Sequence, residues 1–226
     1  MVQFEKSFTE LGGTVTAKVP HEDLQPSYVS ELDKATDGDP DALAVLSYTG
    51  QASVYVREAL EGGYVDEFLF ADGTKGAEWI EGIDAWDALD GSMGTVQGSA
   101  GSDAKDIFET AYEETFGFPT SHPFMGEHYD ATVLIALAAA EAGNTTDSAA
   151  IRDALRSVAN APGEIVGPGR DGIAKALALI AEGKDINYNG ASGDLEFDEN
   201  GDVFGTIEIW TIKDGEIQST GRFETP

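Results

Sequence analysis

The sequence predicts an α/β fold built on a doubly wound parallel sheet. Runs typical of strands alternate with runs of helical spacing through residues 13–83, the order that places helices on both faces of a parallel sheet. Two of the strand-like runs, within 41–50 and 67–73, are apolar throughout, as in strands covered on both faces. Hydrophobic residues make up 41% of the 226-residue chain, which is enough to build a core.

The elements expected in this first part follow from spacing and turn signals. Val15 and Val19 lie in a β-branched run, which predicts a strand. The helix expected after the second strand ends at the pair Gly62 and Gly63. The expected order is a strand at 13–21, a helix at 27–35, a strand within 41–50, a helix at 52–64, a strand at 67–73 and a short helix at 77–83.

From residue 102 onward the pattern becomes helical and then alternating. Ser102 is expected to cap a helix that ends at Gly117. Two prolines in "FPTSHPFMGEH" then predict a linker, followed by helices at 129–143 and 145–160. The last part alternates apolar and polar residues, with turn signals at "ENGD" and "KDGE", so an antiparallel C-terminal hairpin is expected.

Composition excludes several classes of function. Forty-two acidic residues against 13 basic ones give a formal charge of −29, which repels nucleic acid and favours a solvated acidic surface. The chain has no cysteine, so it has no disulfides and no thiolate chemistry. Its longest apolar run, at 131–140, suits a buried helix rather than a membrane span. The start, "MVQFEKSFTELGG", lacks the pattern of a secretory signal.

Gly167, Gly169 and Gly172 have the G-x-G-x-x-G spacing of a dinucleotide-binding loop. Such a loop needs a buried parallel strand before it and an acidic residue at the end of a second strand about 20 residues on. Here the preceding strand-like run is short, Asp171 adds a negative charge, and "DINYNGASGD" is interpreted as a loop. We therefore interpret the three glycines as turn residues. An enzyme that binds a nucleotide through this motif stays the alternative.

Ligands of open α/β sheets bind at the loops after the strands. The first such loop contains Tyr48 and Thr49, and the second contains Asp72. A carboxylate beside a tyrosine suits a small ligand that carries an ammonium group, because charge-assisted hydrogen bonds are strong. The alternative is structural, with Asp72 as the N-cap of the helix expected after "TKG".

Other sequence patterns favour neither a metal site nor an enzyme. The stretch "FDENGD" has three oxygen ligands at calcium-loop spacing but lacks the glycine and the final acid, so a hairpin turn is expected. His122 and His128 lie six residues apart, which matches no metal-ligand spacing. No nucleophile with a plausible base is present. We expect no metal, no cofactor and no catalysis.

Four segments in order give the sequence a resemblance to a known family. They begin "ELGGTVTAKVPH", "PDALAVLSYTGQASVYVREALEGG", "FETAYEETFGFPTSHPFMGEHYDATVLIALAAAEAG" and "INYNGASGDLEFDENGD", and together they span nearly the whole chain. The sequence resembles the extracytoplasmic substrate-binding proteins of ABC transporters of the branched-chain amino acid type. The resemblance implies a type I periplasmic-binding-protein fold, with two α/β lobes that bind a ligand in the cleft between them.

Residue by residue, the resemblance implies a ligand site. It assigns the tyrosine of the second lobe to Tyr48, the acid that receives the ligand's ammonium group to Asp72, and the aromatic wall to Phe124. Many members have Glu where Asp72 stands, so we expect the ammonium group to shift by about a methylene. The neighbours assigned with these are Thr49, Gly73, Glu127 and Tyr129.

The resemblance also implies an organisation. Residues 1–118 would form most of the second lobe, 119–203 the returning part of an incomplete first lobe, and 204–226 a hairpin back on the second lobe. The glycine motif would then be a loop and helix without a nucleotide. An ABC permease is the implied partner. The chain itself is expected in the periplasm or outside the cell. A homodimer, a swapped assembly or a partner chain is a further expectation, because the rest of the first lobe is not in this sequence. A sensory domain of the same fold is the functional alternative.

Overall fold

The computed structural model describes residues 2–98, 101–120 and 122–225 and divides into two compact units. Unit 1 comprises Met1–Val96 with Ile209–Arg222, and unit 2 comprises Gln97–Glu208 with Phe223–Pro226. The chain therefore passes between the units three times. These boundaries differ from the expected ones after residues 118 and 203. The first differs because the helix that follows residue 102 packs its Phe108 on Tyr129, with ring centroids 4.9 Å apart, within unit 2.

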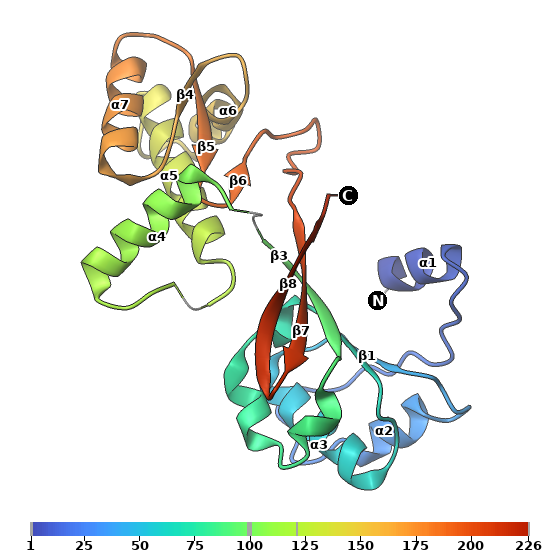
Figure 1. Cartoon of the computed structure of the whole chain (residues 1–226). Helices are drawn as coiled ribbons and strands as arrows, with labels where there is room; N and C mark the ends of the chain where they lie inside the picture. Colours follow the sequence, from blue (N-terminus) through green and yellow to red (C-terminus); the bar gives the residue numbers. More distant parts are fainter. Residues whose placement is uncertain (1, 99–100, 121, 226) are drawn as a thin grey trace. The chain divides into compact units, whose positions relative to one another are not determined.

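Unit 1 is organised around a five-stranded mixed sheet (Figure 1). Its strands, in the order β1-β2-β3-β7-β8, are β1 (Leu43–Val45), β2 (Phe68–Phe70), β3 (Met93–Gln97), β7 (Ile207–Lys213) and β8 (Glu216–Glu224). β1, β2 and β3 are parallel neighbours, which confirms the parallel sheet. β7 and β8 are joined by Asp214 and Gly215, both with positive φ, and such two-residue turns connect antiparallel strands. The C-terminal hairpin is thereby confirmed.

Helices α2 (Val29–Ala35) and α3 (Thr49–Gly62) belong to unit 1, as do α1 (Val2–Glu10) and three short 3₁₀ segments. The segments are η1 (Asp72–Thr74), η2 (Ala77–Gly82) and η3 (Trp86–Leu89), so the short helix expected at 77–83 is of the 3₁₀ type. α3 buries Ala52, Val56 and Ala59 and ends at Gly62, and its C-cap Gly63 has the left-handed conformation, as the glycine pair predicts.

The strand expected at 13–21 does not form. Residues 13–22 have no regular secondary structure, although their β-branched composition favours a strand. A strand requires a hydrogen-bonded neighbour, and no described residue pairs with this segment. β1 lies at the end of the strand order, so its outer edge is also unpaired among the described residues.

Unit 2 contains a three-stranded sheet in the order β4-β5-β6, with four helices. The strands are β4 (Glu164–Val166), β5 (Ile186–Gly190) and β6 (Gly193–Asp194), and the helices are α4 (Asp103–Phe116), α5 (Met125–Glu141), α6 (Ser148–Ala159) and α7 (Gly169–Ala181). Ser102 caps α4 as predicted, since its hydroxyl accepts the Lys105 N–H at 3.1 Å. The unit's core joins Leu137, Val158 and Ile186 from three of these elements.

Two predictions for unit 2 were wrong. Helix α5 begins at Met125, inside the expected linker, because no proline follows Pro123 to interrupt it. The stretch 185–194 was expected to be a loop, yet it contains β5, which pairs with β4 in parallel. In β5 the side chains of Ile186 and Tyr188 are buried and alternate with asparagines, a residue type depleted in strands, which masked the period of two.

A buried carboxylate ties α5 to the end of β5. Asp130 is 1% exposed. Its Oδ1 accepts hydrogen bonds from the Tyr188 hydroxyl at 2.8 Å and the Ala191 N–H at 2.9 Å. Its Oδ2 accepts from the N–H and hydroxyl of Ser192 at 2.7 and 2.6 Å. Burial and then the Asp130 charge raise the pKa of Tyr188 well above its usual value, so the phenol stays a donor. Four donors meet the requirement that a buried charge be fully hydrogen-bonded.

We predict that Asp130→Ala lowers the free energy of unfolding by about 3 kcal/mol, because buried donors lose an ionised acceptor. Urea unfolding followed by far-ultraviolet circular dichroism measures this change. All three tryptophans lie in unit 1, so tryptophan fluorescence reports separately on that unit.

Asp153→Ala is the matched control. The Asp153 side chain is 67% exposed, and among the described residues it pairs with its neighbour Arg152 alone, so its removal should change stability by less than about 0.5 kcal/mol. Equal unfolding curves for both variants would contradict the assigned role of Asp130.

Candidate functional site

Unit 1 brings four of the predicted site residues together at the carboxyl ends of β1 and β2. Val45 and Phe70 are register partners at the ends of the two strands, and the loops that follow lie against each other. A Cβ atom on Gly73 would lie 2.5 Å from the Ser47 carbonyl oxygen and 3.1 Å from Cδ1 of Tyr48. Thr49 lies close by as well, since its Cγ2 would be 3.3 Å from a Cβ on Gly76.

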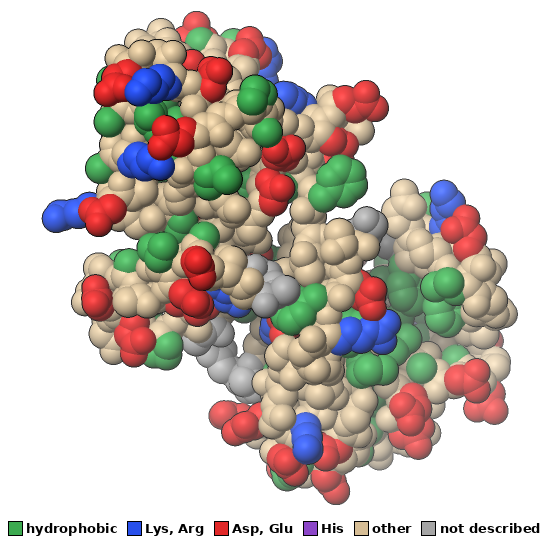
Figure 2. Space-filling model, turned by 45° about the horizontal axis from the view of Figure 1, so that its top comes forward, with side chains coloured by type: hydrophobic (Ala, Val, Ile, Leu, Met, Phe, Trp, Pro, Cys, Tyr) green, Lys and Arg blue, Asp and Glu red, His purple; other side chains and the backbone are tan. Residues whose placement is uncertain are grey.

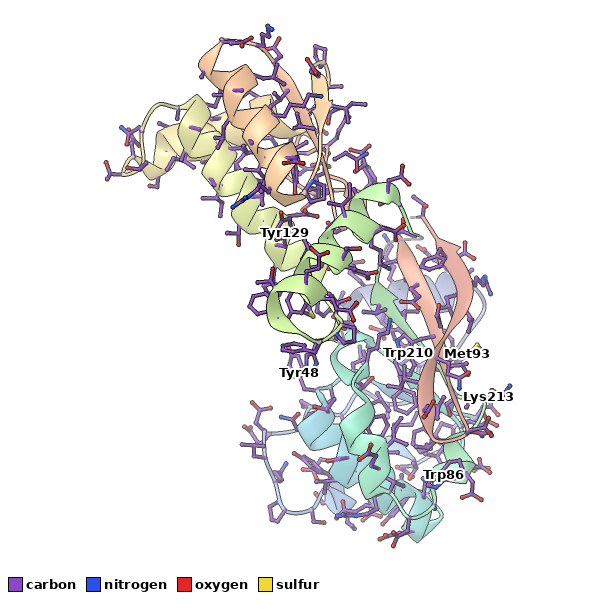
Figure 3. The ribbon with its side chains drawn as sticks, turned by 60° about the vertical axis from the view of Figure 1, so that its left-hand side comes forward. Tyr48, Trp86, Met93, Tyr129, Trp210 and Lys213 are labelled. Atoms are coloured by element: carbon purple, nitrogen blue, oxygen red, sulfur yellow. The ribbon has the colours of Figure 1, made fainter. Side chains whose placement is uncertain are left out.

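The polar groups of this site are open to solvent. Tyr48 is 73% exposed and lies outside the unit's core (Figure 3), and Asp72 is also exposed. Tyr48 is the N-cap of α3 but makes no side-chain capping hydrogen bond. The first intrahelical bond runs from Ala52 N–H to Tyr48 C=O, so the N–H groups ahead of it have no acceptor within the helix. A carboxylate and a positively polarised helix end therefore occur at one edge of the sheet.

The alternative role of Asp72 as a helix cap is wrong. Asp72 begins η1, whose cap residue is Ala71, and the next segment, η2, is capped by Gly76. Neither cap involves a side-chain hydrogen bond. The Asp72 carboxylate is thus not engaged in capping the helix that the sequence suggested.

Contacts with buried residues of unit 1 hold the segment that carries Asp72 in place. Thr74 is fully buried, and its hydroxyl donates to Ala71 C=O at 2.7 Å. The indole N–H of Trp79 donates to Thr74 C=O at 2.8 Å. Phe70 packs between Trp79 and Trp210, with centroid distances of 5.4 and 5.8 Å, and Trp210 is labelled in Figure 3. These contacts give Asp72 a rigid base that local sequence does not reveal.

Helix α3 is anchored on its buried face by Tyr55. Tyr55 packs edge-on against Tyr28 at 5.7 Å and lies 5.7 Å from the His21 ring. Burial raises the pKa of Tyr55 to about 12, so this residue is a neutral core phenol at ordinary pH. The anchor fixes the N-terminus of α3 beside the strand ends.

Phe124, Glu127 and Tyr129 lie in unit 2, on or next to the first turn of α5. Phe124 is the N-cap of α5 and has a left-handed φ of 67°. Glu127 is half-buried in the first turn. The Tyr129 hydroxyl accepts the Gly169 N–H at 2.8 Å, which links α5 to α7. Tyr129 is thus a structural contact of unit 2.

The glycine motif lies in a strand, helix, strand unit rather than in a turn. Gly167 follows β4, whereas Gly169 and Gly172 belong to α7, so the turn interpretation was wrong for these two. Gly172 packs directly on the Gly167 backbone, where any side chain would collide. The N–H of Gly169 is already donated to Tyr129, and β5 ends in Asn189 and Gly190 instead of an acid. The glycines thus serve close packing of α7 on the strand.

The "FDENGD" stretch forms the expected hairpin turn. Asp198 Oδ1 accepts the N–H groups of Asn200 and Asp202 at 2.8 and 2.9 Å, and Phe197 bridges Val203 in antiparallel fashion. The Asp202 backbone hydrogen bond lowers the pKa of Asp198. Within the described part of the chain, no three His, Asp or Glu side chains are placed to hold a metal ion. His128 instead has Nδ1 2.7 Å from Phe124 C=O.

Residues 1–178 of the chain match a protein-family model described as periplasmic binding protein. The chain is 27% identical over 186 residues to the chemotactic signal transduction system substrate-binding protein BasB of Halobacterium salinarum. The match covers 82% of this chain and 42% of that protein.

Solved structures with the same fold include the leucine-binding protein LivK from Thermotoga maritima, at a TM-score of 0.73 and 24% identity over 99% of this chain and 55% of that one. Another is the branched-chain amino acid transporter substrate-binding protein LivJ from Streptococcus pneumoniae, in complex with isoleucine. Its TM-score is 0.65 and its identity 21%, over 98% of this chain and 55% of that one. An ABC transporter solute-binding protein from R. palustris, in complex with benzoate, has a TM-score of 0.67 and 16% sequence identity. That match covers 100% of this chain and 54% of the other. The chain spans about half the length of these proteins.

We predict that Gly73→Ala lowers the stability of unit 1 by about 1–3 kcal/mol, because the added methyl group meets the Ser47 backbone rather than a flexible side chain. Thermal unfolding followed by tryptophan fluorescence measures the change. Gly82→Ala is the control, since a Cβ there meets nothing within 4 Å. If both variants have the melting temperature of the wild type, the close contact between the two loops is not present in solution.

Proposed function

Because this chain belongs to the periplasmic binding protein family, we propose that it is the solute-binding component of an ABC importer and binds a small amino acid or a related ligand. The role is non-catalytic. Binding of the ligand would favour a closed arrangement of two lobes, which the permease recognises.

The observation that carries this proposal is the arrangement at the carboxyl ends of β1 and β2. Asp72 is exposed and has no ion-pair partner among the described residues, and it lies in the loop that contacts Ser47 and Tyr48. The ammonium group of an amino acid would donate to the Asp72 carboxylate, with the Tyr48 hydroxyl and Thr49 as neighbours. Gly73 allows the two loops to lie this close, because a Cβ atom there would meet the Ser47 carbonyl oxygen.

We propose Phe124 as the wall of the side-chain pocket, with Glu127 as its neighbour. On this proposal unit 1 is most of the second lobe and unit 2 is the returning part of the first. The chain would work in the periplasm or outside the cell, a location typical of the family. No helix in the described ranges has the length and apolar character needed to cross a membrane.

A sensory role is the second candidate, favoured by one observation. BasB, which shares 27% identity with this chain over 186 residues, is named for chemotactic signal transduction. The same ligand site would serve transport or sensing.

We also propose that the open edge of β1 pairs with a strand of another chain, either in a homodimer or in a swapped assembly. Unpaired edges bind further strands readily. Three apolar side chains that precede β1 in unit 1 are exposed: Val2 is 76%, Leu11 87% and Leu24 82% exposed. Multi-angle light scattering should therefore give at least twice the monomer mass of 23.9 kDa. A stable monomer across a tenfold concentration range would contradict this assembly.

A thermal melt with a ligand panel tests the binding function. We expect one class among the twenty amino acids, urea and short amides to raise the melting temperature, since a ligand at 100 times its Kd adds about 2.7 kcal/mol to stability. Asp72→Asn should abolish the rise. The matched control is Asp66→Asn, because Asp66 is exposed and lies ahead of β2, at the opposite end of the strand.

Other outcomes separate the alternatives. A rise with NAD or ATP in place of amino acids would favour a nucleotide-binding protein. If an amino acid raises the melting temperature of the wild type and of Asp72→Asn equally, the ammonium site lies elsewhere. No rise with any compound would contradict binding by this chain on its own.

A further inference from the structure

Unit 2 contains a cavity of about 440 Å³ between α5, α6 and the segment 192–206. Every residue that lines it lies between 97 and 206, so the cavity belongs to unit 2 alone. Its volume is within the range of small-molecule sites. None of the residues of the candidate site in unit 1 contributes to it.

The cavity wall is mainly apolar. Leu134 and Ile135 line it from α5, Leu155 from α6, and Leu195, Phe197 and Phe204 from the facing segment. Ile135 is 55% and Phe204 71% exposed, although both are large hydrophobic side chains. Apolar side chains that face an open cavity favour a ligand with a hydrocarbon body.

Two sets of polar contacts hold the wall in place. The Asn160 side chain donates to Phe197 C=O at 2.8 Å and accepts the Phe197 N–H at 3.0 Å. The Asp130 carboxylate accepts hydrogen bonds from the N–H and hydroxyl of Ser192, another residue of the cavity wall. Because both clamps exist without a ligand, the cavity is formed in advance, which lowers the cost of binding.

The charged residues that line the cavity are all acidic: Glu127, Asp130 and Asp194. The Asp130 carboxylate is already occupied by four donors, so it adds no free acceptor. Asp194 is exposed and accepts the Glu196 N–H at 3.2 Å. Glu127 is half-buried and has no ion-pair partner among the described residues, which leaves it free to meet a cation. Figure 2 shows acidic side chains spread over the surface, so the distinguishing feature here is a carboxylate at an apolar cavity.

We propose that this cavity is a second ligand site, for a small organic cation with an apolar body such as an alkylammonium ion. The ammonium group meets Glu127, and the hydrocarbon packs against Leu134, Leu155 and Phe197. The pairing combines a charge-assisted hydrogen bond with apolar burial. This site shares Glu127 with the proposed amino acid site, but it uses none of the residues proposed in unit 1, because an alkylammonium ion has no carboxylate and its contacts all lie in unit 2.

Isothermal titration calorimetry with three probes of nearly equal length tests the assignment. We expect n-hexylammonium to bind, 1-hexanol to bind at least tenfold more weakly, and hexanoate not to bind. Glu127→Gln should reduce the affinity for n-hexylammonium at least tenfold and leave that for 1-hexanol unchanged. n-Hexylammonium and 1-hexanol share the hexyl chain and differ in charge, so their comparison isolates the carboxylate. Hexanoate has nearly the same length and the opposite charge.

Ala131→Trp tests the location, because Ala131 lines the cavity and is exposed on α5. The indole should fill the cavity and abolish binding of n-hexylammonium. Ala136→Trp is the matched control, an exposed alanine of the same helix that does not line the cavity, and it should bind as the wild type does. Circular dichroism establishes that both variants are folded.

Several results would overturn the proposal. Equal binding of n-hexylammonium and hexanoate would remove the role of Glu127. Binding that survives Ala131→Trp, or that Asp72→Asn abolishes, would place the probe outside this cavity. Absence of binding by n-hexylammonium to the folded wild-type chain would overturn the site itself, while leaving the amino acid melt to decide the first proposal.

Discussion

The parallel pairing of β1 with β2 is the constraint on which the candidate site in unit 1 depends. The register that joins Val45 to Phe70 brings both carboxyl ends to one edge, so Tyr48 and Asp72 follow their strands side by side. The loops then meet at Gly73, where only a hydrogen atom fits against the Ser47 carbonyl. Hydrogen bonds from the Trp79 indole and the buried Thr74 hydroxyl hold the second loop in place. Without this pairing, a tyrosine and an acid 24 positions apart would have no common site.

Unit 2 has a smaller sheet, with three short strands among the described residues on which to build a core. Asp130 compensates by binding the end of β5 and the residues that follow it to helix α5. Asn160 does the same for Phe197. Such polar clamps cost desolvation, and they stabilise only when every donor and acceptor is paired. The same clamps shape the wall of the cavity, so the stability of the unit and the form of its cavity depend on shared residues.

Much of the fold was predictable because local patterns agree with it. The apolar runs of β1 and β2, the glycine pair at the end of α3 and the Ser102 cap each act over a few residues, and all three elements form as expected. The expected cover on both faces is incomplete, since Leu69 of β2 is 39% exposed. The errors occur where a partner decides the outcome. Residues 13–21 have strand composition and no neighbouring strand, whereas β5 contains two asparagines and a glycine but has β4 beside it. Strand formation depends on such a neighbour as much as on propensity.

The sequence alone determined the chemical character of the protein: a strongly acidic, cysteine-free α/β chain with a tyrosine and an aspartate after successive strands. These properties follow from composition and from the short-range order of residues. The tertiary structure decided what those residues contact: that Asp72 does not cap a helix, that Gly169 and Gly172 lie in α7, and that Asp130 is a buried clamp. Such roles depend on groups far apart in the chain, and only folding brings those groups within hydrogen-bonding distance.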